Sequence, residues 1–162
     1  MKQKQSIYVE TTIPSYAAAR TSFDTIIAGR QAATIRFFEF EQNKYDLFIS
    51  DFVLQECERG DQEAVERRKA FLSGIKRLTI IDEIEPLANI YVDLLSIPAR
   101  SKIDSLHLAI CCIYKIDILL SWNCKHLGVE SMQTVQRYND THGLWTPKMI
   151  TPDALLEIGK EE

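Results

Sequence analysis

Four short segments of the 162-residue sequence each place one oxygen-bearing polar side chain against a strongly apolar run. These side chains are Glu10 after Ile7-Tyr8-Val9, Glu56 after Val53-Leu54, Asp104 before Leu106-His107-Leu108-Ala109, and Asn123 after Leu119-Leu120. Burying a carboxylate beside apolar groups costs free energy unless a partner or a cation offsets its charge. Such oxygen ligands suit a hard divalent cation. The pattern predicts one shared site, provided that the fold brings the segments together.

The elements that would position these residues alternate between short strands and longer helices. Strands are predicted at 6–10, 46–50, 77–81, 117–121 and 148–150. Helices are predicted from Thr12, over 25–42, 52–59 and 62–73, from Asp82 to about Ser96, from Ser101, and over 132–141 and 152–158. This alternation favours an α/β fold with a mostly parallel sheet and helices on both faces. Sites in such sheets form outside the carboxyl ends of the strands, where all four candidates can face one edge.

Local signals predict the helix ends and the buried helix positions. Thr12 is expected to cap the first helix with Pro14 in its first turn, and Gly60-Asp61 is expected to divide two helices. Asp82-Glu83-Ile84-Glu85 has the spacing of a capping box. Buried positions are expected at Ile26, Ala33, Phe37 and Phe40 in one helix, and at Ile103, Leu106, Ile110 and Ile113 in another.

Glu10 and Glu56 each have a purely structural explanation beside the functional one. Glu10 would cap the first helix, but Thr12 is the better capping residue, which favours a functional Glu10. Glu56 would be a solvated helix residue, but it follows Val53 by three positions and so lies at the border of a buried stripe.

Asp104 and Asn123 have alternatives of the same kind. Ser101-x-x-Asp104 is itself a capping-box spacing, so the carboxylate would neutralise backbone N–H groups, alone or while also facing a cation. Asn123 would be a turn residue after a strand. Asp117 precedes its strand, so we place it at the opposite edge of the sheet and exclude it from the site.

Histidines near the candidates are interpreted conservatively. His107 and Cys111 lie four apart on one helix, but two ligands do not make a zinc site, and a core-edge histidine beside a buried thiol is the preferred interpretation. Lys125 and His126 follow Asn123, where phosphate contact and an ordinary solvated loop are equally compatible with the sequence.

Composition limits the class of protein. The length fits a single domain over residues 1–162, with apolar residues sufficient for one core. The net charge of −4 argues against a broad basic face for nucleic acid, but not against contact with phosphates through a bound cation. The four cysteines are expected to be buried free thiols. The sequence shows no secretory signal and no apolar run of about 20 residues, so we expect a cytoplasmic protein without membrane contact.

Taken together, these segments resemble the PIN domain and, more narrowly, the VapC-like toxins of type II toxin–antitoxin systems. The resemblance extends from Ile7 to about Leu156. Its carriers are Ile7-Tyr8-Val9-Glu10-Thr11-Thr12-Ile13, Ile49-Ser50-x-x-Val53-Leu54-x-Glu56, Asp104-x-x-His107-x-Ala109, Leu120-Ser121-Trp122-Asn123-x-Lys125-His126 and Ile150-Thr151-Pro152. It implies a PIN-like three-layer α/β/α sandwich with a mostly parallel central sheet.

The resemblance also implies metal-dependent cleavage of RNA by a carboxylate cluster. Glu10, Glu56 and Asp104 match the first three acids of the family, and Asn123 falls where many members have a fourth. Mg²⁺ or Mn²⁺ would be held by Glu10 and Asp104, with Glu56 as a direct or water-mediated ligand and Asn123 in support. Glu10 departs from the usual Asp, and Asn123 removes one charge, which leaves open whether one or two metal ions bind.

The implied partners are an RNA substrate, a cognate antitoxin protein and a second copy of the chain, since family members commonly dimerise. Two other classes of function compete with the ribonuclease. One is a PIN-like RNA- or protein-binding module with a degenerate, inactive metal site. The other is a phosphatase or receiver domain, which requires strand-end aspartates that Glu10-Thr11-Thr12 does not supply.

Overall fold

Residues 2–161, which the computed structural model describes, form a five-stranded sheet in the order β3-β2-β1-β4-β5. The strands are β1 (Ser6–Val9), β2 (Asp46–Ser50), β3 (Lys76–Leu78), β4 (Ile118–Leu120) and β5 (Lys148–Ile150). Every pairing in the sheet is parallel. All five predicted strands are therefore confirmed, although three of them are shorter than expected at one or both ends.

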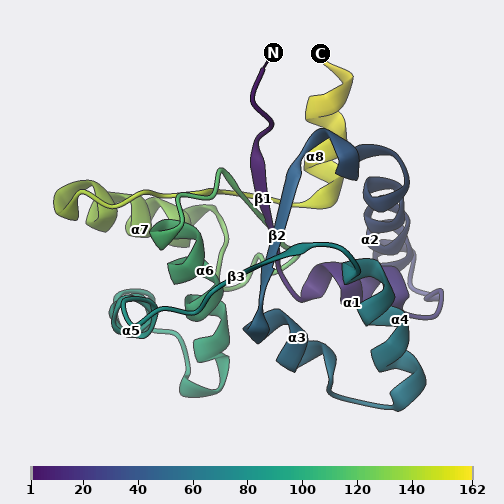
Figure 1. The fold of residues 1–162 in the computed structure, drawn as a ribbon, viewed down its shortest axis with the longest axis horizontal. Coiled ribbons are helices and arrows are strands. Elements are labelled where there is room, and N and C mark those ends of the chain that lie inside the picture. Colours follow the sequence, from purple (N-terminus) through teal and green to yellow (C-terminus); the bar gives the residue numbers. More distant parts are fainter. Residues whose placement is uncertain (1, 162) are drawn as a thin grey trace.

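Two layers of helices cover the sheet (Figure 1). The helices are α1 (Thr12–Ala18), α2 (Thr25–Arg36), α3 (Asp51–Cys57), α4 (Gln62–Leu72), α5 (Ile84–Leu95), α6 (Lys102–Ile113), α7 (Val129–His142) and α8 (Pro152–Lys160). Helix α5 packs on α6 and α7 on one side, and α1 packs on α2 and α4 on the other, where α8 also contacts α2. The predicted three-layer α/β/α sandwich is thus confirmed.

The central strand β1 is buried because it has a neighbour at each side and helices over both faces. Ile7, Tyr8 and Val9 have no exposed surface. Val9 lies opposite Leu120 of β4, and Tyr8 lies opposite Phe48 of β2. A near-continuous apolar run of this kind is what a doubly covered parallel strand requires.

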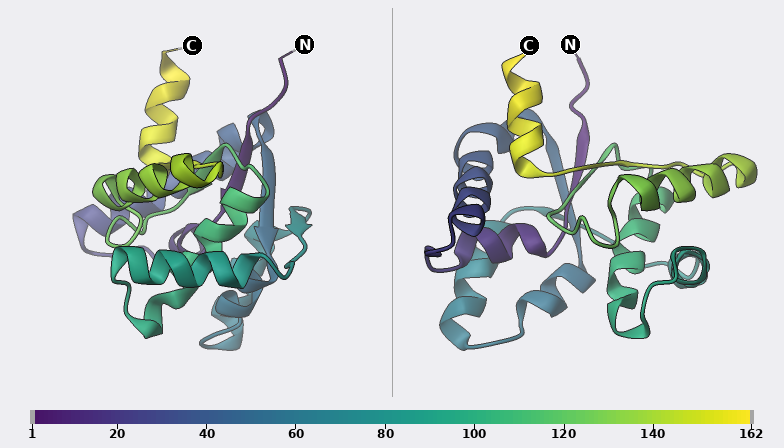
Figure 2. Two further views of the ribbon diagram at one scale, coloured as in Figure 1. Left: turned by 90° about the vertical axis from the view of Figure 1, so that its left-hand side faces the viewer. Right: turned by 180° about the vertical axis from the view of Figure 1, so that it is seen from behind.

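At the amino edge of the sheet, hydrogen bonds between Ser6 and Asp117 connect two neighbouring strands. Asp117, just before β4, accepts hydrogen bonds from the backbone N and the Oγ of Ser6 at 2.9 and 3.1 Å, which ties together the amino ends of β1 and β4. Asp117 therefore lies at the edge opposite to the carboxyl ends of the strands, as predicted. Both ends of the described chain also lie on this amino side of β1 (Figure 1; Figure 2).

The helix predicted over 25–42 is confirmed in extent, but it changes type after Arg36. Helix α2 ends at Arg36, and residues 37–41 form a π-helical turn that continues into a 3₁₀ turn at Gln42–Lys44. The wider turn rotates the following residues, so Phe37 is buried whereas Phe40 is 67% exposed. Ile26, also predicted to be buried, is 69% exposed in the first turn of α2, while Ala33 is half-buried.

Several predicted caps do not form. Thr11, not Thr12, precedes α1, and it makes no capping hydrogen bond through its side chain. The spacing at 82–85 also produces no capping box, because α5 begins at Ile84 without a side-chain cap. Asp61 does cap α4 as expected, by accepting a hydrogen bond from the backbone N of Ala64 at 3.0 Å.

The buried face of α6 differs from the predicted stripe. Ile110 is buried, but Ile103, Leu106 and Ile113 are only half-buried. The buried residues of the helix are instead Ser105, His107, Leu108, Ala109, Ile110, Cys111 and Cys112. Helix α6 lies between the strands and α5, so more than one of its faces is covered and the simple amphipathic period fails.

Two further expectations concern cysteines and membranes. Cys57, Cys111 and Cys112 are buried free thiols, as predicted, whereas Cys124 is exposed. Within residues 2–161, no helix combines the length and the hydrophobicity that crossing a membrane requires.

Candidate functional site

Glu10 lies directly after β1 at the carboxyl edge of the sheet, and only 3% of its surface is exposed. Its backbone N donates to the carbonyl of Leu120, which holds it beside the end of β4. Its Oε2 accepts hydrogen bonds from the backbone N of Thr12 at 2.8 Å, from the Thr12 hydroxyl, and from Ser121 Oγ at 3.0 Å. Glu10 therefore does bond the first turn of α1, which is the structural role expected of Thr12.

The environment of Glu10 disfavours its charge. Burial raises the pKa of Glu10 above its ordinary value, and the electrostatic effect of His107 and the hydrogen bonds from Thr12 only partly oppose it. A carboxylate in this condition gains from any cation that neutralises it.

Glu56 reaches the same edge from α3. Its Oε1 accepts hydrogen bonds from Thr11 Oγ1 at 2.6 Å and from His107 Nε2 at 2.7 Å. Burial alone would raise the pKa of Glu56, but the hydrogen bonds from His107 and Thr11 outweigh burial and bring the pKa below its ordinary value. Two neighbouring carboxyl groups thus have pKa values shifted in opposite directions.

His107 holds Glu56 from the core. It has no exposed surface, and its Nδ1 lies 2.6 Å from the hydroxyl of Tyr8, which is itself 2.7 Å from Ser50 Oγ. Because ionised Glu56 only accepts, His107 Nε2 is the donor in this hydrogen bond, and Nδ1 bonds the Tyr8 hydroxyl. This buried chain of hydrogen bonds fixes the orientation of the Glu56 carboxylate.

The sequence interpretation of His107 was incomplete. It identified a core histidine but did not connect it with Glu56. A buried histidine needs a hydrogen-bond partner for each ring nitrogen. Glu56 and Tyr8, which other segments of the sequence supply, were candidates for these partners.

Asp104 stands in the first turn of α6 and faces a histidine rather than the helix end. Ser101 makes no capping bond through its side chain, and Asp104 Oδ2 lies 2.7 Å from Nδ1 of His126. Both side chains are mostly buried. The capping explanation for Asp104 is therefore not what the structure shows.

Asn123 acts as a turn residue in the loop after β4. Its Oδ1 accepts a hydrogen bond from the backbone N of His126 at 3.2 Å, and its backbone N donates to Ser121 Oγ at 2.9 Å. This arrangement directs His126 toward Asp104. It also links Asp104 to Glu10, because Ser121 Oγ donates to Glu10.

The structure thus joins all four candidate residues around one edge, in two hydrogen-bonded groups that meet at Glu10-Thr11. Glu10, Asn123 and Asp104 are linked through Ser121 and His126, and Glu56 is linked through Thr11. Among the described residues, however, no three His, Cys, Asp or Glu side chains converge closely enough to hold a metal ion as they stand.

The donor atoms nevertheless fit a hard cation. In each carboxylate, one oxygen takes every hydrogen bond, and the other oxygen of Glu10, Glu56 and Asp104 makes none within residues 2–161. Mg²⁺ commonly keeps several waters and takes only one or two protein carboxylates. A site of this kind does not require three protein ligands in direct contact.

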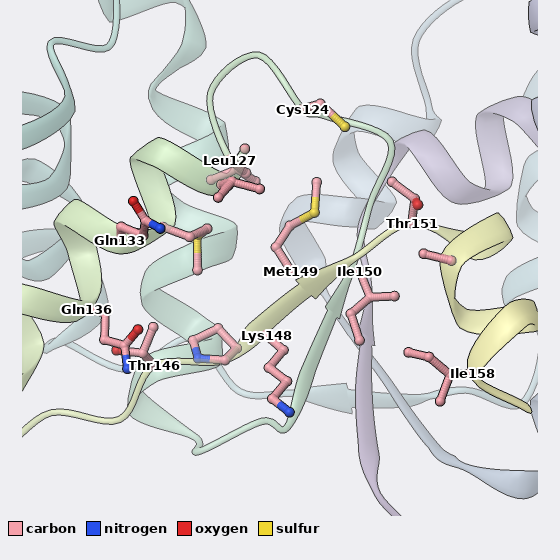
Figure 3. Close-up of a pocket in the computed structure, with 15 residues that line it drawn as sticks. Cys124, Leu127, Gln133, Gln136, Thr146, Lys148, Met149, Ile150, Thr151 and Ile158 are labelled. Atoms are coloured by element: carbon pink, nitrogen blue, oxygen red, sulfur yellow. The ribbon is translucent and has the colours of Figure 1, made fainter. Parts of the chain in front are cut away.

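Two cavities lie near the ends of β4 and β5. The larger, about 640 Å³, is lined mostly by apolar side chains such as Leu127, Met149 and Ile150, and contains none of the four candidates (Figure 3). The smaller, about 580 Å³, is lined by Trp122 and Cys124, the two residues that flank Asn123. Of these two cavities, the smaller one borders the candidate edge more closely.

Comparison with known proteins identifies the fold. No protein-family model and no curated protein matches the sequence significantly. Among solved structures, VapC20 of Mycobacterium tuberculosis, described as a sarcin-ricin loop cleaving toxin, aligns with a TM-score of 0.53 and 17% identity over 70% of this chain and 86% of its own. The chain has a VapC-like fold.

A second structure leads to the same conclusion. A chain of VapBC2 from Rickettsia felis, solved bound to a DNA fragment from the promoter, aligns with a TM-score of 0.54 and 14% identity. The alignment covers 91% of this chain and 98% of the other. The VapC-like fold therefore extends over nearly the whole chain, as the resemblance in sequence predicted.

Replacing His107 with Leu tests its hold on Glu56. The variant removes one partner from Glu56 and one from Tyr8, so we expect the free energy of unfolding to fall by roughly 1–3 kcal/mol. Urea denaturation measures the change, and the substitution His142→Leu at an exposed position serves as a control that should stay within about 0.5 kcal/mol. Equal effects of the two substitutions would contradict the role given to His107.

Replacing Glu10 with Gln tests the raised pKa. Because the folded state binds the Glu10 proton more tightly than the unfolded state, wild-type protein gains stability from this group as pH falls through the raised pKa toward the unfolded value. The amide of the E10Q variant cannot titrate. In chelator, E10Q should therefore melt above wild type at neutral pH, with the difference shrinking in acid; a difference that does not change with pH would refute the assignment.

Proposed function

We propose that this protein is a divalent-metal-dependent ribonuclease, a VapC-like PIN toxin that acts in the cytoplasm. The observation that carries the proposal is the set of three carboxylates at one sheet edge, each held through one oxygen and each with a second oxygen that no described residue hydrogen-bonds. This set occurs at the carboxyl ends of parallel strands, on a fold shared with VapC toxins.

In this proposal, Mg²⁺ or Mn²⁺ is held by Glu10 and Asp104, with Glu56 bound directly or through water and Asn123 in support. When bound, the ion would make a coordinated water more acidic and neutralise charge on the attacked phosphate. The raised pKa of Glu10 is consistent with a ligand that needs a cation.

Glu56 is held ionised with one oxygen fixed. Its pKa is lowered, and His107 and Thr11 hold one oxygen, so that the other can accept a hydrogen bond from a water on the ion. Asp104 is held in a similar way by His126, whose Nε2 makes no hydrogen bond within the described chain. Such fixed groups do not need to reorganise when the substrate binds.

The proposed partners follow from the structural relatives. An RNA substrate is proposed because VapC20 is described as a cleaving toxin of the sarcin-ricin loop. A cognate antitoxin, and assembly as a dimer, are proposed from the VapBC2 complex.

A second candidate function is a PIN-like binding module without turnover. Two observations favour it: the side-chain oxygen of Asn123 is already occupied by the backbone N of His126, and within residues 2–161 no three acidic or histidine side chains converge. This candidate predicts binding without metal-dependent cleavage, so a cleavage assay separates the two functions.

Asp104→Asn tests catalysis. The variant keeps the shape of the side chain but removes a proposed metal ligand, so cleavage of RNA in Mn²⁺ should fall by about a hundredfold or more. Asp117→Asn, the same change at the opposite edge, is the matched control and should cleave like wild type. Equal activity of the Asp104 variant and the control would exclude the proposed site, and absence of metal-dependent cleavage in wild type would support the binding module.

Metal binding is tested separately from cleavage. Mg²⁺ or Mn²⁺ at a hundredfold excess over Kd should stabilise the folded chain by about 2.7 kcal/mol, seen as a higher melting temperature. Asp104→Asn should lose most of this shift and Asp117→Asn should keep it. If wild type shows no shift, or Asp104→Asn shows the full shift, the metal is not held at this edge.

A further inference from the structure

The lining of the cavity beside Asn123 includes one cationic side chain, Arg30, that the proposed chemistry does not use. Its lining combines residues of α2 and the start of α8 with the loop after β4: Thr25, Ile26, Gly29, Arg30, Trp122, Cys124, Thr151 and Asp153. At about 580 Å³, it lies within the size range of small-ligand sites.

Arg30 is the only residue with a fixed positive charge in the described lining of this cavity. Its guanidinium lies 5.4 Å from the ring centroid of Trp122, a cation–π distance, and its Nη1 donates to the hydroxyl of Tyr16 at 3.3 Å. It forms no salt bridge in the described part of the chain, and its remaining N–H groups make no hydrogen bond there. Arg30 is a partly exposed residue whose guanidinium keeps donors that no described residue occupies.

Trp122 connects this cavity with the candidate site. Its indole Nε1 donates to Thr34 Oγ1 of α2 at 2.9 Å, and its backbone N donates at 2.9 Å to Thr12 Oγ1. The same Thr12 hydroxyl donates to Glu10. Trp122, over which Arg30 lies, is therefore linked to Glu10 through the Thr12 hydroxyl.

One acidic group lies in the same cavity. Asp153, in the first turn of α8, accepts a hydrogen bond from Thr151 but forms no ion pair with Arg30. Its charge opposes an anion in the cavity and partly offsets the attraction of Arg30. Its removal therefore gives a test that works in the opposite direction to the removal of Arg30.

We propose that this cavity is a phosphate subsite that binds the RNA backbone one nucleotide away from the cleaved bond, with Arg30 as the positioning residue. The proposal rests on the proposed ribonuclease function. A planar guanidinium with several free donors matches a phosphate diester, and its placement beside Asn123 suits a strand whose neighbouring phosphate enters the carboxylate edge. Holding the adjacent phosphate would strengthen substrate binding equally before and during the reaction.

Binding is measured by fluorescence anisotropy with a labelled single-stranded RNA of about ten nucleotides, in full-length protein carrying Asp104→Asn to prevent cleavage. Arg30→Gln should raise Kd about tenfold and reduce the slope of log Kd against log salt by about 0.7. Arg137→Gln, a substitution of an exposed arginine of α7 with the same change in charge, is the control and should change neither value. Asp153→Asn should lower Kd by about twofold to threefold.

Steady-state cleavage by the otherwise wild-type protein provides the second measurement. Arg30→Gln should raise KM about tenfold and leave kcat within about twofold, because the residue touches a phosphate that does not react.

If Arg30→Gln behaves like Arg137→Gln, or if Asp153→Asn weakens binding, the subsite is refuted while cleavage by wild type still stands. If wild type does not cleave RNA but binds it through Arg30, the proposed enzyme fails and the subsite remains; if no variant binds RNA, the subsite is refuted.

Discussion

The structure at the carboxyl edge of the sheet depends on how the buried carboxylate of Glu10 is held after the central strand β1. Glu10 follows three fully buried residues of β1 and is itself almost fully buried. The hydroxyls of Thr12 and Ser121 and the backbone N of Thr12 hold one oxygen, but burial still raises the pKa. The segments that follow β1 and β4 are arranged around this group, since each of them supplies it with a donor.

The two carboxylates nearest the strand ends are placed in contrasting surroundings. Glu10 receives donors from hydroxyls and backbone, whereas Glu56 receives a donor from a buried histidine whose second nitrogen bonds Tyr8. Divergent pKa values in neighbouring acids are a common basis for dividing the roles of charge stabilisation and proton transfer. In this chain, the contrast between the two pKa values depends on the core, because His107 and Tyr8 have no exposed surface.

The sheet and its carboxyl edge were predictable because both depend on strong local signals. Doubly covered parallel strands must be apolar, and polar residues at their carboxyl ends are conspicuous. The turn role of Asn123 is local and was among the expectations, but the hydrogen bond between Asp104 and His126 could not be predicted, because these residues are 22 apart and lie on different elements. The exposure of Phe40 was missed because a π-helical turn changes the period within one helix. The contact between Glu56 and His107 required knowing how α3 lies against α6.

The position of the two chain ends has a practical consequence. Both leave the fold on the amino side of β1 (Figure 1; Figure 2). Glu10 follows the other end of that strand, where the remaining carboxylates are linked to it. An affinity tag, a fluorescent reporter or a surface-coupling handle can therefore be attached at either end without covering the acidic edge.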